Sequence, residues 1–67
     1  MSQLYIKEKI ELVDEITNLI IKDLKLTDEN KIAYIKKKLT DSTQDELERF
    51  YDAIYRFGAD AIMEAVN

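Results

Sequence analysis

Residues 3–25 read QLYIKEKIELVDEITNLIIKDLK, and this stretch decides the fold. At about 100° per residue, its apolar side chains fall on two neighbouring stripes of one long helix. The first stripe consists of Ile6, Ile10, Val13, Ile20 and Leu24. The second consists of Tyr5, Leu12, Ile16, Leu19 and Leu26. Together they cover well over half of the circumference, whereas a surface helix needs an apolar band of only about 100° or somewhat more. The excess predicts that this helix is covered from more than one side.

The rest of the chain also has the composition of helices. It has one glycine and no proline, so most of the turn chemistry that a sheet requires is missing. Two polar clusters interrupt the apolar pattern. Residues 27–30 offer an N-cap followed by acidic residues, and Thr43 forms a capping box with Glu46. We therefore predict an all-α fold of one domain, residues 1–67, with two long helices and a short middle one. The predicted helices are about 3–25, 28–39 and 44–65.

The predicted third helix places an apolar stripe against the core. Its members recur three or four residues apart: Leu47, Phe50, Ile54, Phe57, Ala61 and Ala65. The opposite face alternates in charge, and residues four apart form weak ion pairs on a helix. The expected pairs are Asp45–Arg49, Asp52–Arg56 and Arg56–Asp60. The middle helix has a narrower stripe of Ile32, Ile35 and Leu39.

Gly58 lies where the periodicity predicts the interior of the third helix, although a glycine there costs about 1 kcal/mol relative to alanine. Two explanations are open. In the first, Gly58 forms a ridge of small residues with Ala61 and Ala65, and another helix packs closely on it. In the second, the helix ends near Phe57 in a left-handed cap, and a short fourth helix follows from Asp60. We favour the close packing.

The small size of the chain favours self-association. A domain of 67 residues buries only about 60% of the surface that its unfolded chain exposes. Disulfides and most metal sites are excluded as reinforcement, because the sequence has no cysteine and no histidine. We therefore expect a homodimer that completes the three-helix assembly. The predicted self-contact consists of Tyr5, Leu12, Ile16 and Leu19. Tyrosine is favoured at interfaces. A second candidate interface is the aromatic edge of Tyr34, Tyr51 and Tyr55.

The sequence offers no catalytic or cofactor-binding residues. Without histidine or cysteine, a general base has to be a carboxylate or a desolvated lysine. No glycine-rich loop is present to hold a phosphate. Asp41, Thr43 and Asp45 alternate as in a calcium loop, but Glu46 occupies the sixth place, which requires glycine. We expect no enzymatic activity, no cofactor and no metal site.

The net charge of −4 argues against nucleic acid as the main partner, because an acidic chain repels phosphate at long range. The alternative is a helix-turn-helix module built from the middle and third helices. Its phosphate contacts would come from Lys36, Lys37 and Lys38. However, the third helix has Asp45, Glu46 and Glu48 where a recognition helix approaches DNA. A role as a DNA mimic is a further alternative for this acidic helix.

One short segment resembles a known family. Asp45-Glu46-Leu47-Glu48, followed by Phe50-Tyr51 and Ala53, is similar to the Asp-Glu-Leu-Glu-x-Phe-Tyr-x-Ala stretch of the Hha/YmoA nucleoid modulators. The resemblance implies a nucleoid-associated role, which belongs with the DNA-binding alternative. Tyr55-Arg56-Phe57 stands where that family has Asp-His-Arg. No residue role is carried over from it.

The preferred function is that of a small acidic regulatory or adaptor protein that binds another protein. The N-terminal residues lack the features of a signal peptide. The longest aliphatic run, residues 19–21, is far below the roughly 20 residues of a membrane span. We therefore expect a cytoplasmic protein. Eight lysines against two arginines, with nine isoleucines, favour an AT-rich genome, such as that of a low-GC bacterium, its phage or a plasmid.

Overall fold

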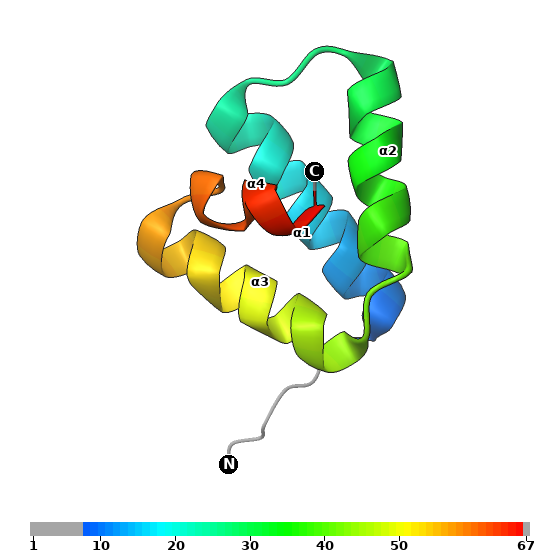
Figure 1. Cartoon of the computed structure of the whole chain (residues 1–67), viewed down its shortest axis with the longest axis vertical. Helices are drawn as coiled ribbons and strands as arrows, with labels where there is room; N and C mark the ends of the chain where they lie inside the picture. The colour runs from blue at the N-terminus through cyan, green and yellow to red at the C-terminus, as the bar shows by residue number, and fades with distance from the viewer. Residues whose placement is uncertain (1–7, 67) are drawn as a thin grey trace.

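The part of the chain that the structure describes is helical apart from caps and short connections. The computed structural model describes residues 8–66. Within that range four helices follow one another along the chain (Figure 1): α1 (Lys9–Leu24), α2 (Glu29–Thr40), α3 (Gln44–Phe57) and α4 (Asp60–Val66). The predicted all-α class is confirmed. The predicted three-helix arrangement is wrong, because the segment assigned to one long third helix forms both α3 and α4.

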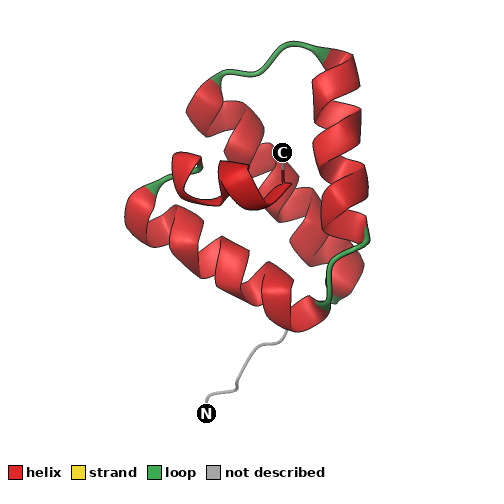
Figure 2. Ribbon diagram, viewed as in Figure 1, coloured by secondary structure: helices red, strands yellow, loops and turns green. Residues whose placement is uncertain are grey.

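The helices enclose one central core. α2 and α3 diverge from the turn at residues 41–43, and α1 packs against both of them. α4 crosses the opening between α2 and α3 and packs against each (Figures 1 and 2). The fully buried side chains of the first three helices are Ile16, Ile20, Ile35, Leu39 and Leu47. Ala59 and Ile62, at the start of the C-terminal segment, are buried in the same cluster.

The first helix begins later than its apolar pattern predicts. Glu8 is extended, with φ −70° and ψ 158°, and acts as the N-cap of α1. Its backbone N–H donates to the Glu11 carboxylate at 3.3 Å, as in a capping box. The helix predicted from about residue 3 includes residue 8, and this is wrong because Glu8 is not helical. Residues 3–7 lie outside the described range. At the other end, Lys25 adopts φ 54° and closes the helix by donating its N–H to the Ile21 carbonyl.

The two predicted polar clusters do begin helices. Asp28 accepts hydrogen bonds from the backbone N–H groups of Asn30 and Lys31, at 3.0 and 3.4 Å. Thr43 and Glu46 form the reciprocal capping box. The Thr43 N–H donates to Glu46 Oε1 at 2.9 Å, and the Glu46 N–H donates to Thr43 Oγ1 at 3.2 Å. These side chains satisfy donors that a helix start leaves unbonded. α2 and α3 therefore begin within one residue of the predicted positions.

Gly58 breaks the third helix, so the favoured close-packing explanation is wrong. Its backbone has φ 93° and ψ 169°, a region that is nearly exclusive to glycine. The Gly58 N–H still donates to the Ile54 carbonyl at 2.9 Å. Beyond it, Asp23 Oδ2 on α1 accepts the N–H of Ala59 at 2.8 Å. The alternative of a short fourth helix from Asp60 is confirmed, although the cap is extended in ψ rather than left-handed helical.

The break at Gly58 changes which side chains of the C-terminal segment face the core. Phe57, Ala61 and Ala65 continue the predicted apolar stripe, yet all three are exposed. Ala59 and Ile62 are buried in their place, at 0% and 3% exposure. The core assignment of Phe57, Ala61 and Ala65 is therefore wrong. The periodicity of one continuous helix does not extend to Ala61 and Ala65 beyond the change of direction, and Phe57 is the last residue of α3, where the chain turns away.

Candidate protein-binding surfaces

The stripe predicted as the self-contact is largely core. Leu12 and Ile16 are 3% and 0% exposed, so this folded chain presents neither of them to a partner. Leu19 is half-buried and packs against the edge of the core. Tyr5 lies outside the described residues. The prediction is wrong for Leu12 and Ile16, because both side chains are buried in the core on α1, against which α2 and α3 pack.

The aromatic edge is partly assembled. Tyr51 and Tyr55 contact one another edge to face, with ring centroids 5.2 Å apart and an interplanar angle of 82°, a favourable geometry for two aromatic rings. The Tyr51 hydroxyl donates to Glu15 Oε2 at 2.9 Å. This hydrogen bond, with burial and the neighbouring Tyr55, raises the pKa of the Tyr51 phenol well above its ordinary value. The bond also joins α1 to α3 at their middle.

Tyr34 belongs to a different surface. It lies on α2, is 46% exposed, and contacts the Lys38 ammonium, which lies 5.9 Å from the ring centroid. Within residues 8–66 no ring contact joins Tyr34 to Tyr51 or Tyr55. The three predicted tyrosines therefore do not form one aromatic cluster.

The candidate phosphate-binding lysines do not form a uniform basic patch. Lys36 pairs with Asp14 of α1 at 3.2 Å, and Lys38 lies over Tyr34. Lys37 is exposed in the last turn of α2, where a cation is favourable next to the helix C-terminus. Two of the three lysines thus already have interactions within the chain.

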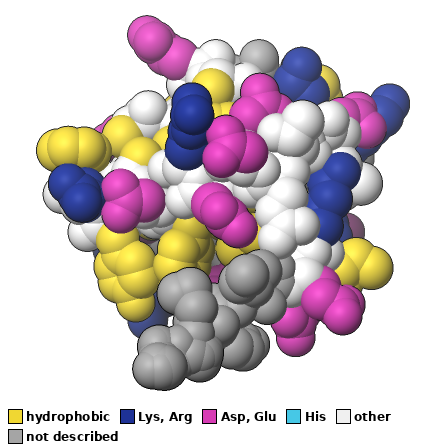
Figure 3. Space-filling view, turned by 90° about the horizontal axis from the view of Figure 1, so that it is seen from below, with side chains coloured by type: hydrophobic (Ala, Val, Ile, Leu, Met, Phe, Trp, Pro, Cys, Tyr) yellow, Lys and Arg dark blue, Asp and Glu magenta, His cyan; other side chains and the backbone are white. Residues whose placement is uncertain are grey.

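The outward face of α3 is neutralised by its own ion pairs. Arg49 contacts Asp45 at 3.3 Å, and Arg56 contacts Asp52 at 3.0 Å. These are two of the three predicted pairs. The predicted Arg56–Asp60 pair is not found, because Asp60 belongs to α4. Figure 3 shows acidic and basic side chains next to one another on this view, with hydrophobic side chains gathered to the left, where α3 ends.

Two large aromatic side chains at the end of α3 are the most exposed apolar feature of this region. Tyr55 is 74% and Phe57 75% exposed. Because they are two residues apart, they point about 200° away from each other around the helix. Phe57 shares its side of α3 with the half-buried Phe50 and Ala53. The sequence pattern identified Tyr55 but assigned Phe57 to the core.

A groove lies beside Tyr55, between the C-terminal halves of α1 and α3. Its volume is about 490 Å³. Its lining residues are Leu19, Lys22, Asp23, Lys25, Ile54, Tyr55 and Gly58. Asp23 is engaged at Ala59, which leaves Lys22 and Lys25 as the charged groups available to an occupant. Neither lysine was identified from the sequence, because single lysines at a helix end give no distinctive pattern.

Neither other types of site nor similarity to known proteins indicates a further function. Within residues 8–66 no group of three or more acidic side chains is arranged to hold a metal ion. No helix in the described range combines the length and apolar character needed to cross a membrane. No protein-family model matches the chain, and the comparisons with curated proteins and with solved structures find no match either.

Proposed function

We propose that this chain is a small regulatory or adaptor protein that acts in the cytoplasm, as a homodimer, by binding another protein. The observation that carries the proposal is the pair of aromatic side chains, Tyr55 and Phe57, exposed at the end of α3. Large aromatic side chains anchor protein interfaces when a partner buries them. The lysine-rich and isoleucine-rich composition supports an origin in a low-GC bacterium, its phage or a plasmid.

The placement of the two aromatic residues supports two separate contacts. A single flat partner surface does not reach both Tyr55 and Phe57, because they lie about 200° apart around α3. One contact serves self-association and the other serves the partner protein, which is the arrangement expected of an adaptor. We assign the partner protein to the side of Phe57, where Phe50 and Ala53 continue the apolar surface.

The DNA-binding alternative has less support. A recognition helix needs free cationic side chains to contact phosphates and base edges. On α3, both arginines are paired with aspartates of the same helix, and the first turn carries Asp45 and Glu46. On α2, Lys36 is paired with Asp14.

The partner is sought by capture from an extract of the native host with the tagged protein, followed by mass spectrometry. We expect a protein retained by the native sequence and lost with Phe57→Ser. Ile10→Ser is the matched control, because Ile10 is also 75% exposed but lies on α1. Equal retention by both variants would contradict the assignment to Phe57. A parallel titration with random duplex DNA at low salt tests the alternative. Binding that weakens by roughly one log–log unit per phosphate contact would favour a DNA-binding module.

A further inference from the structure

We propose that two copies of the chain associate about a two-fold axis through the face shared by α1 and α3, with the helices of the two copies running in opposite directions. This inference rests on the proposed function, because it names the surface on which the homodimer forms. The α1–α3 face consists of Glu11, Glu15, Leu19, Lys22, Lys25, Glu48, Tyr51 and Tyr55.

The charges on this face are separated along α1. Glu11, Glu15, Leu19 and Lys22 follow one another three or four residues apart, so they lie on one stripe of the helix. The stripe begins with carboxylates and ends with a lysine, and Lys25 follows at the C-cap. The face therefore has an acidic end and a basic end, with Leu19 between them.

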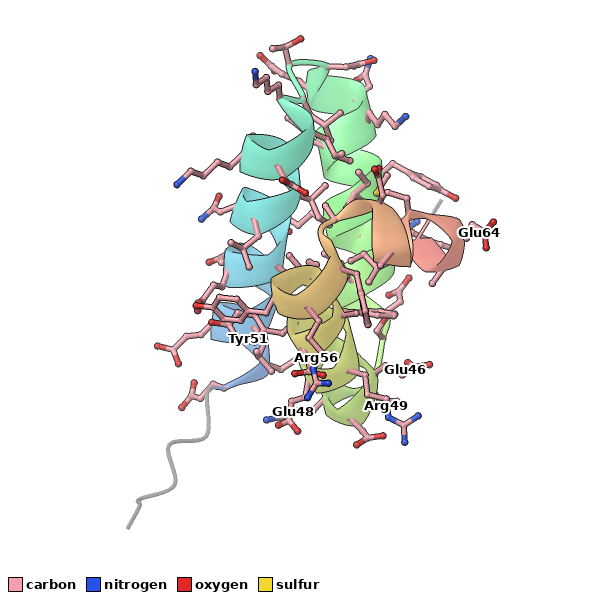
Figure 4. All side chains as sticks on the ribbon, turned by 90° about the vertical axis from the view of Figure 1, so that its left-hand side faces the viewer. Glu46, Glu48, Arg49, Tyr51, Arg56 and Glu64 are labelled. Atoms are coloured by element: carbon pink, nitrogen blue, oxygen red, sulfur yellow. The ribbon has the colours of Figure 1, made fainter. Side chains whose placement is uncertain are left out.

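α3 repeats this order because it runs in the same direction as α1. The hydrogen bonds Tyr51–Glu15 and Ala59–Asp23 each join residues 36 apart in the sequence. A constant offset means that the two segments advance together. Glu48 therefore lies toward the acidic end, and Tyr55 lies level with Leu19 at the centre of the face. In Figure 4, Tyr51 lies beside α1, and Glu48 lies below it on the same view.

The centre of the face is apolar and incompletely filled. Tyr55 is 74% exposed, and its ring is held against Tyr51. The groove of about 490 Å³ lies directly beside it and has Leu19 and Ile54 in its lining. When two copies meet about an axis near Leu19, the two Tyr55 rings approach one another at that axis, because Tyr55 is level with Leu19 at the same offset of 36 residues. An isologous contact brings the same surface patch of both copies together.

The charged side chains of the α1–α3 face favour a second copy of the chain as the molecule that binds there. Within residues 8–66, Lys22, Lys25 and Glu48 have no intramolecular ion pair. In the antiparallel arrangement the acidic end of each copy faces the basic end of the other, whereas a parallel arrangement brings like charges together. The chain carries a net charge of −4, so two copies repel unless their contact separates charge in this way. Association also adds buried apolar surface to a small core.

The first test is the mass of the full chain in solution, measured by light scattering and sedimentation over a range of concentrations. We expect a dimer, and we expect Tyr55→Ser to raise its dissociation constant by roughly tenfold or more, as for a central aromatic anchor. Ile10→Ser is the control. Ile10 lies about 180° from Leu19 around α1 and should leave the dissociation constant unchanged. A monomer at a concentration on the order of 100 µM, or equal effects of the two variants, would overturn the proposal.

The second test addresses the antiparallel charge pairing. One variant carries Lys22→Glu and Lys25→Glu, and the other carries Glu11→Lys and Glu48→Lys. Circular dichroism verifies that each is folded. We expect each variant alone to be monomeric, because both of its ends then have the same sign. Mixing the two should restore a dimer that contains one copy of each. Dimers of either variant alone, or no recovery on mixing folded variants, would contradict the arrangement.

The two proposals fail separately. If the protein forms a dimer that Tyr55→Ser disrupts but captures no other protein, the proposed α1–α3 contact holds and the adaptor function is contradicted. A monomer that captures a partner through Phe57 keeps the partner-binding role and removes the dimer. Ile10→Ser serves as the control in both measurements, so the outcomes are directly comparable.

Discussion

α1 and α3 are amphipathic helices of similar length, 16 and 14 residues, but the chain covers them very differently. α1 has five buried side chains, while α3 has two, Leu47 and Ile54. The difference arises where the chain turns at Gly58. α4 folds back across the core from that point, and the end of α3 is left with Tyr55 and Phe57 exposed. The amount of apolar surface on a helix therefore does not decide whether it is buried or exposed. The direction of the next element does.

The largest expected effect is on the side of α1 that faces the core. Ile16 is completely buried, so Ile16→Ala should lower the free energy of unfolding by about 2–5 kcal/mol. Phe57→Ala is the matched change on α3, and it should alter stability by less than about 0.5 kcal/mol. Urea denaturation measures both, at one protein concentration, because the stability of a dimer depends on concentration. Similar losses in the two variants would remove the contrast between the helices.

The second expected effect is at the break itself. Gly58→Ala should destabilise the protein by about 1–3 kcal/mol, because the φ of 93° is strained for any residue with a Cβ atom. The added Cβ would also lie 3.3 Å from Asp23 Oδ2. A thermal melt compares the variant with the native chain. A rise in melting temperature would mean that position 58 is helical and that α3 and α4 are continuous.

A smaller effect is expected at the contact that holds the break against α1. Asp23→Ala removes the acceptor of the Ala59 N–H and should lower the free energy of unfolding by about 1 kcal/mol. Asp23→Asn keeps an oxygen acceptor and should lose less. Denaturation of both variants gives the comparison. If the asparagine variant were the less stable of the two, the hydrogen bond would not account for the role of Asp23.

The smallest effect is expected in alkaline solution, where Tyr51 links α1 to α3. Its pKa is raised in the folded state by the hydrogen bond to Glu15, while in the unfolded chain it is about 10. The unfolded state therefore loses this proton first as the pH increases. The contribution of Tyr51 to stability is complete below pH of about 10 and falls above it. Tyr51→Phe should flatten this decline in the free energy of unfolding, and an unchanged slope would show that the bond is not maintained in solution.

The helix starts at Asp28 and Thr43 could be predicted from the sequence because a cap is a local device. Its donor and acceptor lie within three residues of each other, so a sequence window contains the whole interaction. The charge pairs on α3 could be predicted for the same reason. The late start of α1 could not, because the apolar pattern continues through Glu8 without interruption.

The roles of Ile16 and Phe57 could not be predicted, because they depend on contacts between distant segments. Ile16 and Phe57 both fit an amphipathic stripe. Ile16 is core because α2 and α3 pack against α1, while the return of the chain after Gly58 leaves Phe57 exposed. That return depends on Asp23, which is 36 residues from Ala59 and has no distinguishing local pattern. The candidate site shows the same limit. Tyr55 was identified from its type, while Lys22 and Lys25 became relevant only once α1 and α3 were aligned.

The central claim is that the chain breaks at Gly58 and that α4 completes the core. Backbone chemical shifts measured by solution NMR test it most directly, together with nuclear Overhauser contacts of the Ile62 side chain. We expect helical shifts over α3 and α4 (Gln44–Phe57 and Asp60–Val66), an interruption at Gly58 and Ala59, and contacts from Ile62 to the buried core cluster. An unbroken run of helical shifts through Gly58, with Ile62 free of such contacts, would contradict the account.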